Sequence, residues 1–356
     1  APFNRADGWP TSMPMVVLLG EAVRESDLAG IRQPERSVAA DSALVLLEVG
    51  TGRRIPFLSE MDANATDPRR AALIVRPLEP LRFGTRYTLA LRTSARTVDG
   101  APLPLSRGFA ALRDNTPSTD PRIEAARPRY EEVFAALGRA GVMRSEVQLA
   151  LEWTTASRQH VLGPILGMRA EVIRRAAMPS ALPYTIDRVV DSPNNNVARI
   201  VFGTFTPPNY LNGDSALVFG PDGSATLQPK PPSYPFTMVI PARARTATSP
   251  LPLTVFGHGV FGRGEEYLTG GIGTGLIQPL AQELGSVVIA TDWIGLSGGD
   301  LQLLIAQVVP NINRVTLVTD RLLQSLVNNL TLTELGVGAL GRDMRVRPGM
   351  GELIDP

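Results

Sequence analysis

The chain has 356 residues, of which 44% are hydrophobic and 19% charged, a composition that allows two globular domains and a connector. The net charge is +1 without a basic block, so the sequence lacks the electrostatic footprint of a nucleic-acid-binding protein. The absence of cysteine excludes disulfides, thiolate metal sites and cysteine nucleophiles. No apolar run reaches the roughly 18 residues that span a bilayer. We therefore expect neither a nucleic-acid partner nor a transmembrane segment.

Residues 1 to 116 contain short apolar runs separated by turn residues, which predicts an all-β sandwich. The predicted strands are 15 to 19, 43 to 49, 71 to 75 and 87 to 91. The run 87 to 91 and the turn Val98-Asp99-Gly100 resemble the penultimate strand and turn of bacterial immunoglobulin-like domains. The resemblance implies an immunoglobulin-like domain closed by a final strand around Phe109.

A helical connector is predicted for residues 117 to 183. A loop rich in Pro, Asp and Thr covers 114 to 128, and the three- and four-residue spacing of the apolar residues that follow predicts an amphipathic helix. A strand at 147 to 155 and a second helix at 162 to 178 complete this part.

From residue 184 to 356 the pattern changes from β structure to alternating strands and helices. The predicted strands are 197 to 205, 216 to 219, 225 to 227, 236 to 240, 253 to 256 and 286 to 292, and the predicted helices are about 265 to 284, 300 to 309 and 314 to 330. The apolar run 287 to 290 between helices favours a parallel sheet. The fold class expected for the whole chain is multidomain, β followed by α/β.

The glycine-rich loop after residue 256 is the strongest candidate for a functional site. The strand 253 to 256 is followed by Gly257, Gly259, Gly262 and Gly264 within eight residues. Glycine lets the backbone turn sharply and lets another group approach closely. Amide N–H groups in a loop between a strand and a helix are suited to binding a negatively charged oxygen.

The segment Gly257-His258-Gly259-Val260 resembles the His-Gly oxyanion loop of lipases and esterases of the α/β-hydrolase fold. Together with the turn Asp292-Trp293-Ile294-Gly295 and the immunoglobulin-like domain, it is similar to large secreted bacterial lipases and esterases of the virulence-factor type. The resemblance implies that the Val260 N–H binds the oxyanion of an ester or lipid substrate, and that His258 and Gly259 shape the loop.

Two positions are open for the nucleophile. Gly295-Leu296-Ser297-Gly298-Gly299 matches the G-x-S-x-G pattern, which makes Ser297 a candidate. However, the family carries its nucleophile one strand later, and no histidine follows His258 to complete a triad. The alternative is a nucleophile beyond residues 352 to 356, supplied together with the acid and the histidine by a C-terminal portion or a companion chain.

No metal site and no cofactor are expected. The acidic residues lack the spacing of a calcium loop, and the glycines at 270 to 275 are not followed by the Lys-Ser or Lys-Thr of a phosphate loop. The start at Ala1, without an initiator Met, is expected either of a trimmed sequence or of a mature protein whose signal peptide has been removed, and we expect a secreted, cell-surface or periplasmic protein. The expected function is a serine ester hydrolase. The alternative is a non-catalytic surface or interaction protein on a hydrolase-like scaffold.

Overall fold

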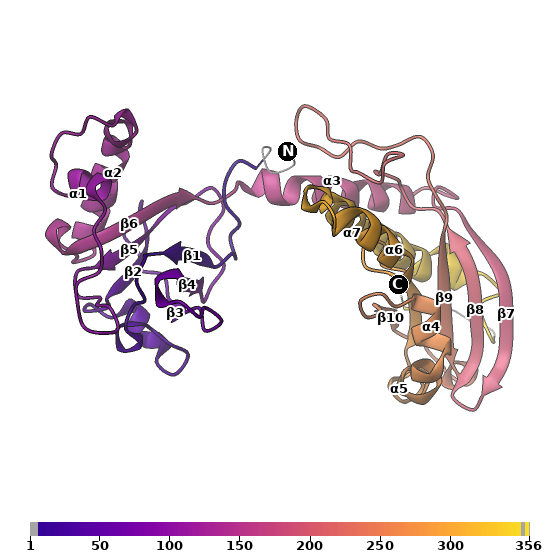
Figure 1. The fold of residues 1–356 in the computed structure, drawn as a ribbon. Coiled ribbons are helices and arrows are strands. Elements are labelled where there is room, and N and C mark those ends of the chain that lie inside the picture. Colours follow the sequence, from indigo (N-terminus) through magenta and orange to yellow (C-terminus); the bar gives the residue numbers. More distant parts are fainter. Residues whose placement is uncertain (1–5, 350–352, 356) are drawn as a thin grey trace. The chain divides into compact units, whose positions relative to one another are not determined.

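A computed structural model describes residues 6 to 349 and 353 to 355. It divides into two compact units, Arg5–Val161 and Leu162–Pro356, which are described separately below (Figure 1). The segment predicted as a connector is split between them, because residues 117 to 161 belong to the first unit and residues 162 to 183 to the second.

The first unit contains two three-stranded sheets. Its strands and main helices are β1 (Met15–Leu18), β2 (Leu44–Glu48), β3 (Phe57–Met61), β4 (Ala72–Pro77), β5 (Arg86–Arg92), α1 (Arg107–Arg113), α2 (Pro121–Arg139) and β6 (Val147–Thr154). One sheet has the order β1-β4-β3 and the other β2-β5-β6, and all their pairs are antiparallel.

The two sheets share one hydrophobic core. Val17, Leu73 and Phe57 of one sheet share a core with Leu46 and Leu89 of the other. Alternation along each strand brings these apolar side chains to the same face. The strand β6 was predicted to lie in the connector, but it pairs with β5 and completes the second sheet.

The predicted closing strand around Phe109 is wrong, because this residue lies in helix α1. Ser106 caps the helix by accepting a hydrogen bond from the Phe109 N–H. Phe109 and Leu112 are three residues apart, so they lie on one helix face and pack with Phe134 of α2 against the β2-β5-β6 sheet. A third, helical layer therefore covers this sheet.

Helix α2 begins earlier than predicted. Asp120 caps its N-terminus and Pro121 occupies the first turn, where a missing N–H is tolerated. Pro128, which was assigned to a loop, lies inside the helix. The buried residues Val133 and Leu137 anchor the helix on the sheet, and this packing offsets the backbone hydrogen bond that proline lacks.

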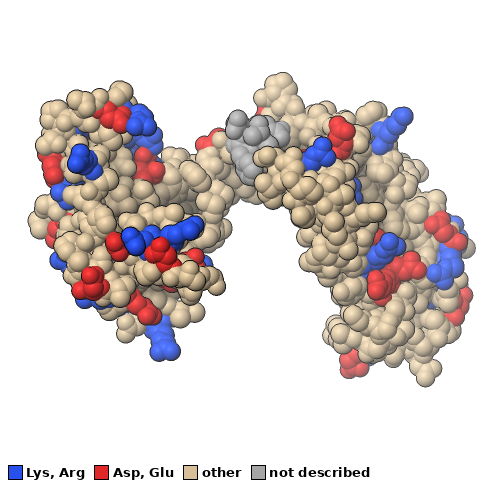
Figure 2. Space-filling model, viewed as in Figure 1, with Lys and Arg blue, Asp and Glu red and all other residues tan. Residues whose placement is uncertain are grey.

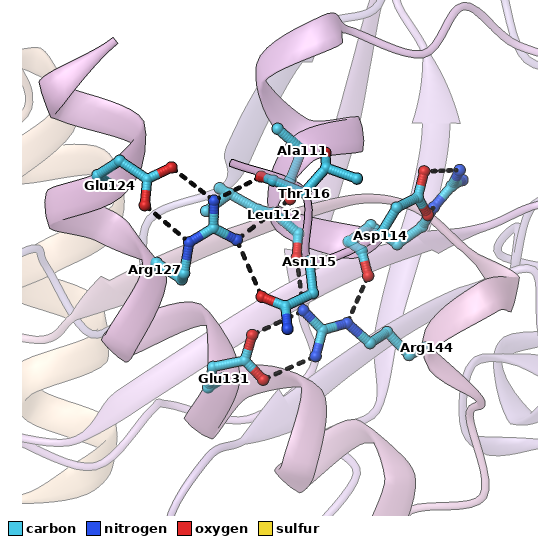
Figure 3. A network of polar contacts seen from close by, with 10 residues as sticks. Ala111, Leu112, Asp114, Asn115, Thr116, Glu124, Arg127, Glu131 and Arg144 are labelled. Carbon is cyan, nitrogen blue, oxygen red and sulfur yellow. Dashed lines mark hydrogen bonds and ion pairs between the residues drawn. The ribbon is translucent and has the colours of Figure 1, made fainter. Parts of the chain in front are cut away.

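Two arginines hold the C-terminal end of α1 (Figure 3). Arg144 donates to the carbonyl oxygens of Leu112 and Arg113, each at 2.5 Å, and makes two 2.7 Å bonds to the carboxylate of Glu131. Arg127 donates to the Ala111 carbonyl at 3.2 Å and forms a two-bond ion pair with Glu124. Cations at the C-terminal end satisfy free carbonyls and interact favourably with the helix dipole.

The second unit is built on one five-stranded sheet. Its main elements are α3 (Arg158–Ala176), β7 (Tyr184–Asn194), β8 (Val197–Phe205), β9 (Tyr234–Pro241), β10 (Leu253–Phe256), α4 (Gly264–Thr269), α5 (Gln278–Leu284), β11 (Val287–Thr291), α6 (Leu301–Leu303), α7 (Thr316–Val337) and α8 (Ala339–Arg342). A π-helix, Gly273–Ile277, precedes α5, and another, Leu304–Val308, follows α6.

The sheet has the order β10-β11-β9-β8-β7 and is mixed, not parallel throughout. Only β10 and β11 run parallel, and the helices α4 and α5 connect them. The other three pairs, β7 with β8, β8 with β9 and β9 with β11, are antiparallel. A short turn links β7 to β8, which is possible only between antiparallel strands.

Helices cover both faces of this sheet (Figure 1). On one face, Leu332 and Leu335 of α7 pack with Ile289 of β11. On the other face, Leu268 of α4 and Ala281 of α5 pack with apolar residues of β8, β9 and β11. This burial on both sides explains why residues 287 to 290 are all apolar.

The segments 216 to 219 and 225 to 227 do not form the predicted strands and make only isolated bridges. They belong to a long loop whose backbone binds the polar face of α7. Gln324 accepts from the Tyr210 N–H and donates to the Pro208 carbonyl, and Asp320 accepts from the Leu217 N–H. Buried polar side chains of α7 therefore satisfy backbone groups of this loop that would otherwise pair with a neighbouring strand.

Charges of both signs are interspersed on the face shown in Figure 2, and no large patch of one sign is visible there. Within the described residues, no helix is long and apolar enough to cross a membrane.

Candidate functional site

The glycine-rich loop starts where β10 ends, at Phe256, and runs to the first turn of α4. A Cβ atom at Gly259 would lie 2.7 Å from the Tyr267 Oη, and one at Gly262 would lie 2.6 Å from the Tyr267 ring. A Cβ at Gly257 would lie 3.3 Å from Nε1 of Trp293. Packing against Tyr267 and Trp293 therefore requires small residues in this loop, a reason that the sequence pattern did not reveal.

His258 connects this loop to the segment that follows β11. Its Nε2 accepts a hydrogen bond from the Trp293 N–H at 2.8 Å, so the lone pair is at Nε2. The neutral ring then carries its hydrogen on Nδ1, which lies 2.7 Å from the Gly259 carbonyl oxygen and donates to it. With both nitrogens bound to the backbone, His258 orients the loop and has no nitrogen available as a general base.

The backbone at Val260 is the exposed tip of the loop. The Phe261 N–H donates to the Leu296 carbonyl at 2.7 Å, and the Gly262 N–H donates to the Gly259 carbonyl at 2.9 Å. The amides of Gly259 and Val260 have no acceptor among residues 6 to 349 and 353 to 355. Phe261 has a φ of +61°, a left-handed conformation that is uncommon for a non-glycine residue. The loop thus presents two adjacent donors without an acceptor, directly followed by two amides that are fixed by hydrogen bonds.

Asp292 fixes the other end of the loop. One of its carboxylate oxygens accepts from the Gly264 N–H at 2.8 Å, at the first residue of α4. Gly295, three residues later, has a φ of +102°, and a Cβ there would lie 2.8 Å from the Val318 carbonyl oxygen. The Asp-x-x-Gly turn is therefore an anchor between the loop and α7.

Ser297 lies next to the loop in space, but its side chain is not free. The Gly298 N–H donates to the Gly262 carbonyl at 2.9 Å, which brings the two segments together. Ser297 is 4% exposed, and its Oγ donates to Asp300 Oδ2 at 2.5 Å. Its φ of −84° and ψ of 167° are those of ordinary extended backbone, not of a strained nucleophile turn.

Asp300 organises this turn. The same Oδ2 accepts from the amides of Gly295 and Ser297, while Oδ1 accepts two bonds from the guanidinium of Arg321. Asp300 is 1% exposed, so this buried carboxylate is satisfied on both oxygens. The Ser-x-x-Asp spacing is a variant of a capping-box pattern and could have identified the pair from the sequence.

The second histidine, His160, lies in the first unit, near the start of α3, where its N–H donates to Ser157 Oγ at 3.0 Å. Neither histidine makes a hydrogen bond to Ser297 in the described part of the chain. In that same part, no group of three or more His, Cys, Asp or Glu residues is placed to hold a metal ion. Chemically, the arrangement offers backbone N–H donors but no assembled nucleophile and base.

The sequence matches no protein-family model, and no curated protein is significantly similar to it.

Proposed function

We propose that this chain supplies the oxyanion-binding loop of a secreted serine ester hydrolase, and that a C-terminal portion or a companion chain supplies the nucleophile, acid and histidine. The observation that carries the proposal is the pair of amides without an acceptor at Gly259 and Val260, at the carboxyl end of β10, the edge strand that runs parallel to β11. Donors fixed in advance stabilise the negative charge that develops on an ester carbonyl oxygen during acyl transfer.

The hydrogen bonds of His258 support this role. A neutral histidine bound to Trp293 and Gly259 keeps the loop in one conformation and does not take the proton of the nucleophile, which falls to another base. The nucleophile is assigned elsewhere because the Ser297 hydroxyl is buried on Asp300. The resemblance to secreted hydrolases with an immunoglobulin-like domain adds the expectations of an ester or lipid substrate and of an extracellular or periplasmic location.

The test compares Val260→Pro, which removes the amide hydrogen, with Val260→Ala, which keeps it. We expect Val260→Pro to lower hydrolysis of p-nitrophenyl butyrate by the protein purified from its source about 10²–10³-fold, and Val260→Ala to change it little. Circular dichroism and thermal melting would verify that both variants fold. Equal activity of the two variants would contradict the oxyanion role.

The second candidate is a non-catalytic interaction protein. It is favoured by one observation, which is that the described residues hold no serine hydrogen-bonded to a free histidine nitrogen. Treatment with a fluorophosphonate probe separates the two candidates. A labelled serine outside this chain supports the hydrolase, label on Ser297 would overturn its structural assignment, and neither label nor turnover would favour the interaction protein.

A further inference from the structure

A cavity of about 550 Å³ opens in the second unit, where helices α3 and α7 both end. The two helices contribute to one apolar core, which holds Met168 and Val172 of α3 and Val327 of α7. The cavity is lined by the end of α3 and the loop that leads to β7, and by the last turn of α7 together with α8. Its volume lies in the range of pockets that bind small molecules.

This cavity is distant from the glycine-rich loop. A Cβ at Gly295, in the turn that anchors the loop, would contact the Val318 carbonyl oxygen near the start of α7. Glu334, which lines the cavity, follows sixteen residues later in the same helix, so it lies about 24 Å further along the axis at a rise of roughly 1.5 Å per residue. The cavity is therefore a separate place on the second unit, and its role does not depend on the proposed ester hydrolysis.

The lining combines buried leucines with two unpaired charges of opposite sign. Leu182 and Leu335 belong to the core of the sheet. Glu334 is half-buried and Arg342 is exposed, and neither side chain makes an ion pair or a hydrogen bond with any residue in the described part of the chain. They are eight residues apart, whereas side chains that pair along a helix are three or four residues apart. Two such charges beside apolar surface suit a ligand that carries both charges and an apolar group.

The neighbouring charged side chains already have partners. Arg175, which also lines the cavity, donates from its Nε to the carboxylate of Glu171 at 2.7 Å. Asp343, the residue after α8, accepts two hydrogen bonds from the guanidinium of Arg345, at 2.7 and 3.1 Å. The two unpaired charges of the lining are therefore the ones that remain available to a ligand.

The loop between α3 and β7 adds backbone donors. A turn is closed by a 3.3 Å hydrogen bond from the Ala181 N–H to the Met178 carbonyl, and Ser180 within this turn has a φ of +58°. This left-handed conformation is uncommon for serine, and such conformations are concentrated at functional sites. The N–H groups of Ser180 and Leu182, two residues that line the cavity, have no acceptor among residues 6 to 349 and 353 to 355. Carbonyl groups of a peptide are suitable acceptors for these donors.

We propose that this cavity binds a short peptide with free termini, whose ammonium group pairs with Glu334 and whose carboxylate pairs with Arg342. An apolar side chain of the peptide packs on Leu182 and Leu335, and the Ser180 N–H binds one of its carbonyl groups. The length follows from the spacing of the two charges. Eight residues of helix rise about 12 Å, and an extended peptide of three residues spans about 10 Å. The ligand class is therefore a peptide of about three residues.

Titration of the ¹⁵N-labelled chain with the tripeptide Ala-Leu-Ala tests the proposal. We expect saturable shifts of the Ser180 and Leu182 amide signals, and no change at the Gly259 and Val260 amides of the glycine-rich loop. N-acetylation and C-terminal amidation of the peptide should each weaken binding about tenfold or more, because each removes a charge-assisted hydrogen bond. No shift at Ser180 and Leu182 up to about 5 mM peptide would overturn the proposal. Binding of either blocked peptide, or of free leucine, as tight as that of Ala-Leu-Ala would also overturn it.

Two variants assign each end of the peptide to its side chain. Arg342→Gln should weaken binding of Ala-Leu-Ala about tenfold and leave binding of the amidated peptide unchanged, and Glu334→Gln should have the same pair of effects with the acetylated peptide. Arg169→Gln and Glu283→Gln are the matched controls, because they change exposed residues outside the lining. Thermal melting verifies that all four variants fold. Equal losses for the free and the blocked peptide, or losses as large in the controls, would overturn the assignment.

Discussion

The hydroxyl of Ser297 and the buried carboxylate of Asp300 are joined by a 2.5 Å hydrogen bond, which makes the serine of the G-x-S-x-G sequence part of a capping turn. We therefore expect Ser297→Ala to lower the free energy of unfolding by about 1.5–3 kcal/mol, as for the loss of a hydrogen bond to a charged group, without changing ester hydrolysis. Chemical denaturation and p-nitrophenyl ester assays measure the two effects. Loss of turnover in a folded Ser297→Ala protein would restore this serine as the nucleophile.

Asp300 should matter more than the serine that it binds. Asp300→Ala leaves the Arg321 guanidinium without its carboxylate and two amides without an acceptor, so we expect a loss of about 3–5 kcal/mol in the free energy of unfolding. Denaturant titration of the variant beside Ser297→Ala measures the difference. A loss no larger than that of Ser297→Ala would show that the ion pair contributes little.

The contact between Gly259 and Tyr267 predicts a specific rescue. A methyl group at position 259 would meet the Tyr267 hydroxyl at 2.7 Å, so Gly259→Ala should destabilise the protein by about 1–3 kcal/mol. Tyr267→Phe removes that oxygen and should restore part of the loss, which a double-mutant cycle measures.

Two neighbouring glycines provide controls for this cycle. Gly262→Ala would meet the Tyr267 ring itself, so Tyr267→Phe should not rescue it. Gly271 is helical, and among the described residues no atom outside its own helix lies within 4 Å of the position that an added methyl group would take. Gly271→Ala should therefore be neutral or stabilising. Rescue of Gly262→Ala by Tyr267→Phe would contradict the predicted geometry.

Arg144 should be the most sensitive arginine of the first unit. It bonds two carbonyls of α1 and both oxygens of Glu131, and its guanidinium lies 4.3 Å from the Phe134 ring centroid. We expect Arg144→Ala to cost about 2–3 kcal/mol, and Arg144→Lys to recover only part, because an ammonium group cannot reproduce the planar set of bonds. Arg122, with its side chain 88% exposed, is the control, and Arg122→Ala should be nearly neutral in thermal melting.

Acid should weaken the same region. The hydrogen bond from Arg127 lowers the pKa of Glu124 to about 2, and Arg144 lowers the pKa of Glu131. Since both pKa values are lower in the folded state than in the unfolded chain, this stabilisation is present above about pH 4.5 and is lost as the pH falls towards 2. The melting temperature of the unit should therefore decline across this window, less steeply in Glu124→Gln, and added salt should reduce the difference. An identical pH profile in Glu124→Gln would contradict the assignment.

The sequence alone determined the elements whose signal is local. The runs 197 to 205 and 253 to 256 form strands with the predicted boundaries, because a continuous apolar segment bounded by turn residues favours one structure. It also determined the position of the glycine loop between a strand and a helix. Local patterns of this kind therefore predicted the presence of several strands and helices.

Only the tertiary structure decided features that depend on contacts distant in sequence. Phe109 is helical because a sheet surface is available to its helix, and α2 extends through Pro128 because its apolar face is anchored on that sheet. His258 is placed by Trp293, and the glycines are required by Tyr267, through contacts that no local spacing encodes. The glycine loop could be predicted from the sequence as a motif. Its free amides and the open edge of β10 could not, because they depend on the backbone pairing of the whole folded chain.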